Sequence, residues 1–347
     1  ERTVLVVDDS AFMRRVISDM IDGFPGYRVV GMAADGRKAL HSIEQLDPDV
    51  VTLDIEMPGL NGFDVLQRVI SSMPRPVVVL SAHTAEGSRA ALRALELGAV
   101  DYVTKPSGPI SLDIARVEPR LYEALQAAST AHMGAIVEQG TLTTGRRLKS
   151  PRISCGAVVA IAASTGGPTA LGYVLASLPA DLGAAVLIVQ HMPPGFTAAL
   201  ATRLDGLAPL SVAEATGGET VVPNHAWIAP ANFHMRVGQV GAAVKILLDQ
   251  SETIWGTRPS ADALFPTVAA AFGPRCVGVV LTGMGRDGAA GLAAIKAAGG
   301  RTVAQDRESS VVYGMPGQAV SQGAAERAIP LRDMPAAIIE CLESLED

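Results

Sequence analysis

The sequence predicts an α/β protein made of two doubly wound parallel-sheet domains. The chain has 347 residues, more than one ordinary hydrophobic core accommodates. Hydrophobic residues make up 48% of it, charged residues 18% and aromatic residues only 4%, which is typical of an aliphatic α/β protein. In both halves, apolar runs of strand length alternate with helical stretches, and this alternation predicts parallel sheets covered on both faces.

The first domain is expected at residues 1–125, followed by a linker at 126–153. Five apolar runs predict its strands, at residues 4–7, 29–32, 50–55, 77–80 and 102–104. The fifth helix is expected to start at Pro119, because proline suits the first turn of a helix. In the linker the periodicity lapses into small, polar and basic residues.

The second domain is expected at residues 154–347. Four apolar runs predict a further parallel sheet, at residues 157–162, 185–190, 277–281 and 302–304. Between them, the segments 235–240 and 243–248 are short and separated by turn residues. They predict an antiparallel hairpin in or beside the sheet.

Bulk properties exclude several classes of function. A formal net charge of -7 and a pI near 5.4 argue against binding nucleic acid, which needs a basic surface. Cys155, Cys276 and Cys341 form no disulfide framework or metal-binding spacing and suit a reducing compartment. We expect no leader, and the sequence shows no apolar run of about 18 residues. We therefore expect a cytoplasmic protein that does not insert into membranes.

Acidic residues close two strands of the first domain. Asp8 and Asp9 follow the first run and Asp54 ends the third, so a doubly wound sheet brings them to one crevice. Clustered carboxylates favour a bound cation, and hard oxygen ligands favour Mg²⁺. Ser81 and Lys105 end two further strands and supply donors for phosphoryl oxygens. Each residue alone is more often a cap, a turn residue or a solvated charge, but together they predict a phosphoryl site.

These strand ends resemble the response-regulator receiver family over about residues 1–125. Three segments carry the resemblance: VVDDS at 6–10, LDIEMPG at 53–59 and TKP at 104–106. It implies a flavodoxin-like receiver in which a histidine kinase transfers a phosphoryl group to Asp54. The same resemblance implies that Asp8, Asp9 and Asp54 hold Mg²⁺, with Ser81 and Lys105 sensing the phosphoryl group.

In the second domain, Ser164 lies between a buried apolar run and a helical stretch. This places its hydroxyl on a sharp strand-to-helix turn, where the backbone N–H groups of Thr165 and Gly166 could bind an oxyanion. The surrounding pattern AxSxG differs from the GxSxG nucleophile elbow. A helix cap with a glycine turn and a phosphate-binding loop are alternatives.

His191 and Asp287 also follow predicted strands, so Ser164, His191 and Asp287 can meet in one crevice as nucleophile, general base and orienter. Their order along the chain differs from the Ser, Asp, His order of the α/β-hydrolases, which excludes that family. If His191 is the base, activity should fall as the pH drops below neutrality.

Two alternatives remain open from the residues alone. The segment GMGRDG at 283–288 fits a dinucleotide-binding fingerprint, with Asp306 near the end of the next strand. That reading leaves Ser164 and His191 without a role. The other alternative is a non-enzymatic response regulator whose second domain only binds a partner, with Ser164 and Asp287 as helix caps.

Four segments behind the receiver resemble the chemotaxis protein-glutamate methylesterase family: STGGP at 164–168, QHMP at 190–193, RPSAD at 258–262 and TGMGRDG at 282–288. The resemblance spans nearly the whole chain and implies a Rossmann-like esterase domain with Ser164, His191 and Asp287 as its triad. Thr165 and Met284 would line the site. We expect no cofactor in this domain.

The implied substrates are γ-methyl esters of glutamate on the cytoplasmic helices of chemoreceptors, and receptor glutamines that are deamidated. The chain would thus be a phosphorylation-activated ester hydrolase acting in chemotaxis adaptation. We expect the tethered receiver to cover the crevice until Asp54 is phosphorylated, because the added negative charge shifts the receiver surface.

Overall fold

The computed structural model describes residues 1–82, 84–105, 110–141, 148–149 and 156–345. The chain divides into two compact units, Glu1–Gly140 and Thr141–Asp347, which are described separately. Residues 142–147 and 150–153 of the expected linker lie outside the described residues. Within the described part of the chain, no helix is long and apolar enough to cross a membrane.

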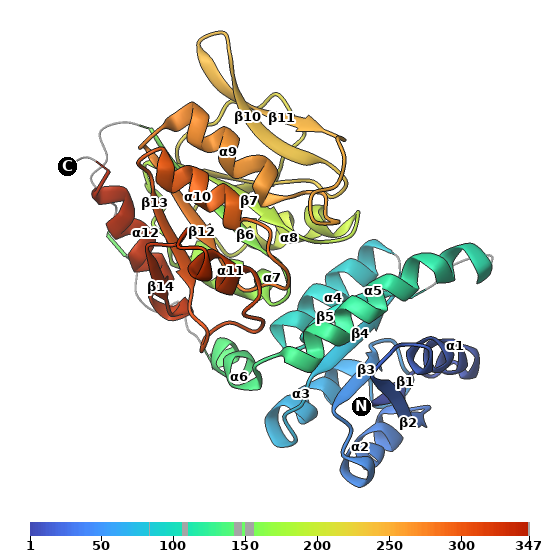
Figure 1. The fold of residues 1–347 in the computed structure, drawn as a ribbon. Helices are drawn as coiled ribbons and strands as arrows, with labels where there is room; N and C mark the ends of the chain where they lie inside the picture. Colours follow the sequence, from blue (N-terminus) through green and yellow to red (C-terminus); the bar gives the residue numbers. More distant parts are fainter. Residues whose placement is uncertain (83, 106–109, 142–147, 150–155, 346–347) are drawn as a thin grey trace. The chain divides into compact units, whose positions relative to one another are not determined.

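The first unit contains the predicted five-stranded parallel sheet (Figure 1). Its strands are β1 (Arg2–Val7), β2 (Tyr27–Ala33), β3 (Val50–Asp54), β4 (Val77–Ser81) and β5 (Asp101–Thr104). Their spatial order is β2-β1-β3-β4-β5, the flavodoxin-like order, so the order reverses between β1 and β3. The crevice at the carboxyl ends of β1 and β3 is therefore the switch point where such sheets bind ligands.

Helices cover both faces of this sheet. They are α1 (Ala11–Asp22), α2 (Gly36–Leu46), α3 (Gly62–Ser72), α4 (Ala85–Glu96) and α5 (Ile110–Thr130), and a further helix, α6 (Met133–Thr141), follows them. The predicted start of the fifth helix at Pro119 is wrong, because α5 begins at Ile110 and continues through the proline. Val117 before the proline and Leu121 after it are both buried, which favours a continuous helix despite the hydrogen bond that Pro119 removes.

The expected linker begins with helical residues. Helix α5 reaches Thr130, and α6 follows after two residues. Ala135 and Ile136 of α6 are buried, and Ile136 lies against Gly98 of the receiver unit. This packing explains why the segment is ordered although its small and polar residues favour a linker.

The second unit contains a seven-stranded parallel sheet in the order β14-β13-β12-β6-β7-β9-β8. Its strands are β6 (Ala157–Ala163), β7 (Ala184–Gln190), β8 (Ser211–Glu214), β9 (His225–Ile228), β12 (Cys276–Val280), β13 (Arg301–Gln305) and β14 (Arg327–Ile329). The four strands predicted from the sequence form the centre. The outer strands β8, β9 and β14 are missed because they have only three or four residues.

The predicted antiparallel hairpin is present as a separate two-stranded sheet. Its strands are β10 (His234–Val240) and β11 (Ala243–Asp249), paired from His234 with Asp249 to Val240 with Ala243. The hairpin therefore lies beside the large sheet and does not join it.

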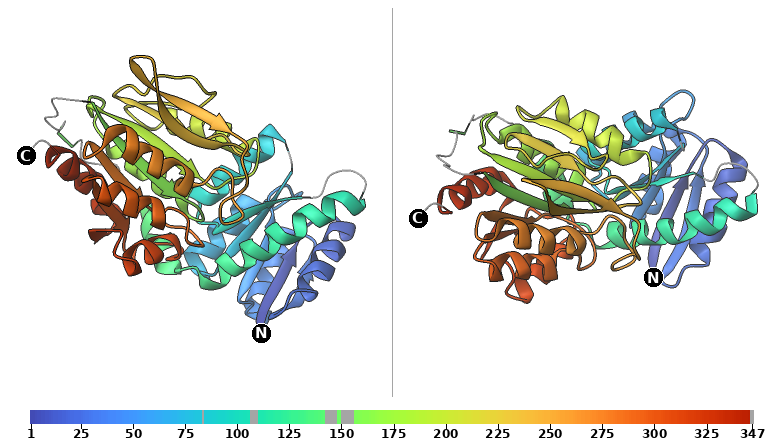
Figure 2. Two further views of the ribbon diagram at one scale, coloured as in Figure 1. Left: turned by 45° about the horizontal axis from the view of Figure 1, so that its top comes forward. Right: turned by 90° about the horizontal axis from the view of Figure 1, so that it is seen from above.

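Helices pack on both faces of the large sheet, as the views in Figure 2 show. They are α7 (Gly167–Ser177), α8 (Phe196–Asp205), α9 (Ala261–Phe272), α10 (Ala289–Ala297), α11 (Met315–Ser321) and α12 (Met334–Glu343), with a 3-10 turn at Leu331–Asp333. Helix α10 contacts α9 and α11, whereas α7 contacts α8 and α12.

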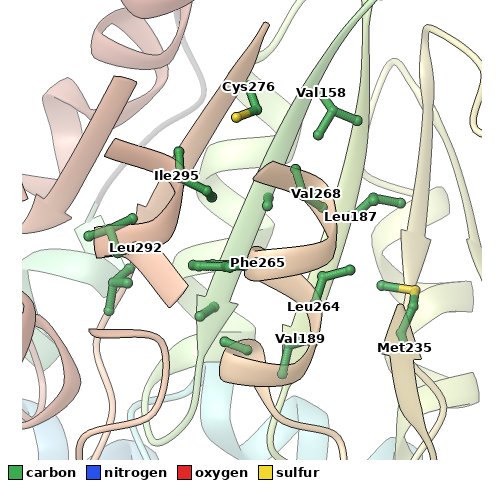
Figure 3. Close-up of a cluster of buried hydrophobic side chains, with 14 of the residues drawn as sticks. Val158, Leu187, Val189, Met235, Leu264, Phe265, Val268, Cys276, Leu292 and Ile295 are labelled. Atoms are coloured by element: carbon green, nitrogen blue, oxygen red, sulfur yellow. The ribbon is translucent and has the colours of Figure 1, made fainter. Parts of the chain in front are cut away.

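Helix α9 is anchored in the hydrophobic core of this unit (Figure 3). Leu264, Phe265 and Val268 of α9 are fully buried, and they pack with Leu187 of β7 and Met235 of the hairpin. Full burial of such side chains stabilises the fold by about 1.5–3 kcal/mol each. The first turn of α9 is thus held rigidly beside the carboxyl ends of the central strands.

Candidate functional site

Three carboxylates meet at the switch point of the receiver sheet. Asp8 follows β1, Asp9 comes next, and Asp54 ends β3. One oxygen from each lies within 4.8 Å of the others, and Asp8 and Asp54 are buried whereas Asp9 is exposed. The structure thus brings together the three residues that the sequence selects.

Lys105 lies between the two buried carboxylates. Its Nζ is 2.8 Å from Asp8 Oδ2 and 2.6 Å from Asp54 Oδ2. Burial raises the pKa of Asp54 to about 6; Lys105 opposes this rise and the charge of Asp8 adds to it. Burial also tends to depress the pKa of Lys105, but the two carboxylates outweigh burial and hold that pKa above its usual value.

The acidic cluster fits a Mg²⁺ ion. All three donors are carboxylate oxygens, the hard ligands that this ion prefers. Asp8 Oδ2 and Asp54 Oδ2 are buried with Lys105 as their ion-pair partner, so a second cation would relieve the remaining negative charge.

Ser81, the predicted phosphoryl-sensing hydroxyl, ends β4 beside β3. Its hydroxyl donates to the carbonyl oxygen of Gly87 in α4 at 2.8 Å. Contact with a phosphoryl group on Asp54 would require this hydroxyl to leave Gly87, so the sensing role stays a prediction.

Ser164 lies directly after β6, at the centre of the large sheet. Its backbone N–H donates to the carbonyl oxygen of Thr282, and its own carbonyl accepts from Gly167 at the start of α7. Gly283 lies so close that a Cβ there would be 2.8 Å from Ser164 Cβ. The tight strand-to-helix turn predicted from the sequence is therefore present.

His191 follows β7, the neighbour of β6. The last residues of the two strands, Ala163 and Gln190, are paired, so Ser164 and His191 leave the sheet side by side. Nε2 of His191 lies 2.8 Å from Oδ2 of Asp287, which follows β12 on the other side of β6. The predicted base and orienter are thus in contact.

Asp287 is held by the first turn of α9. Oδ1 accepts from the Ser260 hydroxyl at 2.6 Å and from the Asp262 N–H at 3.0 Å. Oδ2 accepts from the Ala261 N–H at 2.7 Å and pairs with His191. Free N–H groups and the positive end of the helix dipole both stabilise an anion here. Sequence reasoning assigned no role to Ser260, although Ser-x-Asp before an apolar run is a helix-start signal.

The surroundings of Asp287 keep it ionised. Burial, the largest single influence, raises the pKa of Asp287, but the hydrogen bond with His191 and those from Ser260 and Ala261 together outweigh burial. The pKa of Asp287 therefore lies below its usual value. An ionised Asp287 makes Nε2 of His191 the protonated nitrogen and leaves Nδ1 free to accept a proton.

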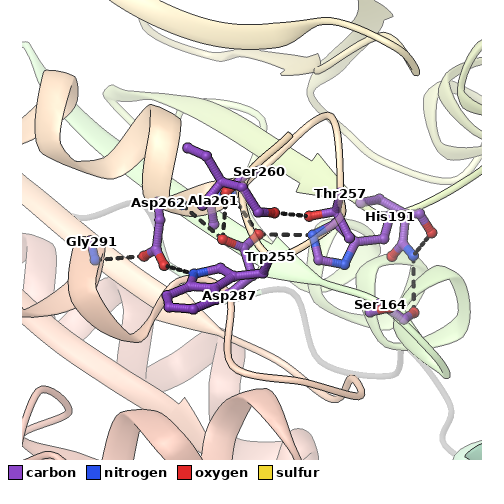
Figure 4. Close-up of polar contacts among 11 residues, drawn as sticks. Ser164, His191, Trp255, Thr257, Ser260, Ala261, Asp262, Asp287 and Gly291 are labelled. Atoms are coloured by element: carbon purple, nitrogen blue, oxygen red, sulfur yellow. Dashed lines mark hydrogen bonds and ion pairs between the residues drawn. The ribbon is translucent and has the colours of Figure 1, made fainter. Parts of the chain in front are cut away.

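Ser164 completes the arrangement without yet contacting the base. In Figure 4 the His191 ring is seen between the Asp287 carboxylate and Ser164. Across the described residues, no hydrogen bond joins the Ser164 hydroxyl to His191. Such contacts are often long before substrate binds.

Backbone donors lie beside Ser164. Gly166 has a φ of +78° and caps α7, and its N–H has no acceptor among the described residues. Thr165 is buried, and its carbonyl accepts from the Thr282 hydroxyl at 3.0 Å. Met284 follows Gly283, which lies against Ser164, and its side chain is exposed. These positions suit the predicted lining residues.

Gln190 was missed by sequence reasoning. Its side-chain amide donates to the carbonyl oxygens of Ser164, at 2.9 Å, and His191, at 3.1 Å. Because Gln190 is almost fully buried, it ties the nucleophile turn to the base turn. A Cβ on Gly167 would lie 2.1 Å from its amide oxygen, which explains the glycine. A polar residue closing an otherwise apolar strand was the available signal.

Two parts of the chain match known families. Residues 4–115 match the response regulator receiver domain, and residues 159–338 match the CheB methylesterase. Together with the fold, these matches define a receiver joined to an esterase unit.

Relatives match over almost the full length. The protein-glutamate methylesterase/protein-glutamine glutaminase of Geobacillus kaustophilus is 45% identical over 342 residues, 98% of each chain. The protein of the same name from Bordetella bronchiseptica is 45% identical over 337 residues, covering 97% of this chain and 96% of that protein. The chain belongs to the CheB family of protein-glutamate methylesterases/protein-glutamine glutaminases.

A solved structure supports the fold of the second unit. The crystal structure of the Thermotoga maritima CheB methylesterase catalytic domain is 40% identical, with a TM-score of 0.53, and covers 54% of this chain and 98% of that chain. The fingerprint at 283–288 falls inside the methylesterase match and supplies Asp287 to His191. The match and this contact favour an esterase unit over a dinucleotide-binding domain and over a non-enzymatic partner-binding module.

Proposed function

We propose that this chain hydrolyses γ-methyl esters of glutamate, and deamidates glutamine, on chemoreceptor helices, with Ser164 as nucleophile. The 2.8 Å contact between His191 and Asp287, beside Ser164 at the ends of adjacent strands, carries this proposal. Relatives with that named activity match the chain over nearly its whole length.

The reaction follows from the positions of the three side chains. Nδ1 of His191 takes the Ser164 proton while Oγ attacks the ester carbonyl, and backbone N–H groups near Gly166 stabilise the oxyanion. The imidazolium returns the proton to the leaving methanol. Water, deprotonated in the same way, then releases Ser164 and a glutamate carboxylate. With glutamine as substrate the leaving group is ammonia.

Asp287 supports this cycle electrostatically. Its carboxylate orients the ring through Nε2 and stabilises the imidazolium that forms in each half-reaction. The donors from α9 keep the carboxylate from taking the proton itself, because they favour its charged form.

The most direct test is the Ser164→Ala variant. It should release no methanol from methylated receptor, while the receiver still incorporates acid-labile phosphate at Asp54. Methanol release at the wild-type rate would refute Ser164 as nucleophile. Loss of both activities would indicate misfolding, which circular dichroism checks.

We further propose that a histidine kinase phosphorylates Asp54. Asp8, Asp9 and Asp54 would hold Mg²⁺, which neutralises charge on the incoming phosphoryl group. Lys105 neutralises the carboxylates before transfer and binds a phosphoryl oxygen afterwards. An Asp54→Ala variant should incorporate no phosphate from a small phosphodonor, and continued labelling would refute the assignment.

Control by the receiver is proposed to act on access to Ser164. Deletion of residues 1–140 should raise the basal rate of methanol release, because the covering unit is gone. The related Thermotoga maritima catalytic domain was crystallised by itself, so the remaining part should fold. A folded but inactive fragment would mean that the receiver activates the site directly.

A further inference from the structure

An exposed arginine–tryptophan pair borders the catalytic carboxylate. Arg286 directly precedes Asp287, and its guanidinium lies over the ring of Trp255 at 4.9 Å from the ring centroid. Trp255 is 55% exposed, the highest value among the large hydrophobic residues of the described chain. The mechanism proposed above uses neither residue.

The position of Trp255 is fixed by the same helix that holds Asp287. Its indole N–H donates to Oδ2 of Asp262, in the first turn of α9, at 2.7 Å. Oδ1 of Asp262 accepts from the Gly291 N–H, also at 2.7 Å. Figure 4 shows this chain of contacts beside Asp287 and His191. The indole is therefore held in place beside Asp287 and His191.

The backbone of Trp255 is fixed by a tight turn. Its φ is +55° and that of Gly256 is +78°, so these two residues form the two-residue connection of a small hairpin between Ile254 and Thr257. Two backbone hydrogen bonds between Ile254 and Thr257, at 3.1 and 3.0 Å, close this turn. Trp255 is therefore held by its backbone as well as by the hydrogen bond to Asp262.

The charge of Arg286 is available to bind an anion. Its side chain is exposed, and no ion pair involving it occurs among the described residues. A guanidinium stacked on an aromatic ring keeps its edge free for bidentate hydrogen bonds with a carboxylate. The chain carries a formal net charge of -7, which repels an acidic substrate. The positive charge of Arg286 beside the site attracts such a substrate locally.

We propose that Arg286, positioned by Trp255, binds a free glutamate carboxylate on the substrate helix while a neighbouring methyl ester occupies the Ser164 crevice. This specificity role rests on the function proposed above. Each hydrolysis produces such a carboxylate. The enzyme would thus favour helical segments whose neighbouring glutamates are already unesterified.

Synthetic helical peptides test this role with the full-length protein, phosphorylated at Asp54 by a small phosphodonor in every measurement. Each peptide carries one glutamate γ-methyl ester and either glutamates or alanines one and two turns away. For the wild type we expect kcat/KM to be about fivefold higher with glutamate neighbours, which corresponds to about 1 kcal/mol, the upper value for an exposed ion pair. The preference should shrink as salt is added.

Substitution of Arg286 separates this contact from general charge effects. In Arg286→Gln the ratio of the two kcat/KM values should fall to about one, and in Arg286→Glu it should invert. The control variant is Arg301→Gln. Arg301 is an exposed arginine paired with Glu326, and it begins β13. It therefore lies at the amino ends of the parallel strands, whereas Ser164 and His191 lie at the carboxyl ends. Arg301→Gln should keep the wild-type ratio.

Binding gives a second readout that does not depend on turnover. The chain has two tryptophans, and Trp227 is buried, so fluorescence changes report mainly on Trp255. In Ser164→Ala, a tryptophan-free peptide with glutamate neighbours should change this fluorescence and bind about fivefold more tightly than the alanine peptide.

The outcomes distinguish the two proposals. No methanol from either peptide would refute the esterase assignment itself. Methanol from both at equal kcat/KM, or a preference unaffected by Arg286→Gln, would overturn the role of Arg286 and leave the esterase assignment standing.

Discussion

The Asp287→Asn variant tests how the orienting carboxylate works, because the structure predicts which way the amide will face. With the amide oxygen at the Oδ2 position, the bonds from His191 and the Ala261 N–H are kept. The amide nitrogen then faces Ser260, whose hydroxyl can turn and accept from it. The Asp262 N–H keeps the Ser260 oxygen at 3.1 Å as its acceptor.

The opposite orientation is less favourable. In that orientation the amide nitrogen faces the Ala261 N–H, so two hydrogen-bond donors meet. The backbone N–H can only donate, and it is left buried without an acceptor. Such a group costs about 1–3 kcal/mol. We therefore expect the first orientation, in which Nε2 of His191 stays protonated and Nδ1 stays free to act as base.

The variant thus loses the negative charge and keeps the geometry. Loss of one preorganised electrostatic contact costs about 3 kcal/mol in the transition state, so kcat for methanol release should fall roughly 100-fold. A fall of about 10⁴-fold, as expected when an amide imposes the wrong tautomer, would refute the predicted orientation. An unchanged kcat would refute any role for Asp287.

The same variant carries a pH prediction for stability. Because the pKa of Asp287 is depressed in the folded protein, its charge contributes stability above the usual aspartate pKa of about 3.9. That contribution is lost as the pH falls through the lower folded value. In urea titrations, the wild type should exceed Asp287→Asn most near neutral pH, and the difference should shrink as the pH falls from 5 towards 3.

Three further substitutions test the supports of the site. Gln190→Met keeps the side-chain volume but removes two hydrogen bonds, so kcat should fall about tenfold with KM little changed; an unchanged kcat would contradict the positioning role. Gly167→Ala sets a Cβ 2.1 Å from the Gln190 amide oxygen and should lower the unfolding free energy by about 1–3 kcal/mol, whereas Gly172→Ala, with 3.7 Å of space, should not; thermal unfolding decides. Ser260→Ala removes the α9 cap and one donor to Asp287, so it should cost about 1–2 kcal/mol of stability, which Ser260→Thr should restore.

Strand ends explain why much of the molecule could be predicted from the sequence. Asp54, Ser164 and His191 each follow a long buried apolar run, and in a parallel sheet the ends of neighbouring runs must meet. That reasoning needs only periodicity and the direction of the strands. It predicted both sheets and the contact between His191 and Asp287.

Features that depend on tertiary contacts could not be predicted in this way. Helix α5 passes through Pro119, with Val117 before the proline and Leu121 after it both buried, and local propensity does not show this burial. The anchoring of Asp287 on α9 joins residues 25–27 positions apart through a helix start whose partner the sequence does not reveal. The carbonyl contacts of Gln190 likewise exist only once β6 and β7 are paired.

The hydrogen bonds that hold Asp287 at the first turn of α9 limit where regulation can act. The body of that helix is part of the hydrophobic core, so the carboxylate cannot loosen unless the whole unit opens. Amide hydrogens at Ala261 should accordingly exchange with solvent only through global unfolding. If the receiver controls access to Ser164 as proposed, phosphorylation of Asp54 needs at most about 5.5 kcal/mol to switch between the two states, and it need not disturb the contacts of Asp287. Under that proposal Asp287 keeps its position in both signalling states, and phosphorylation changes only whether substrate reaches the site.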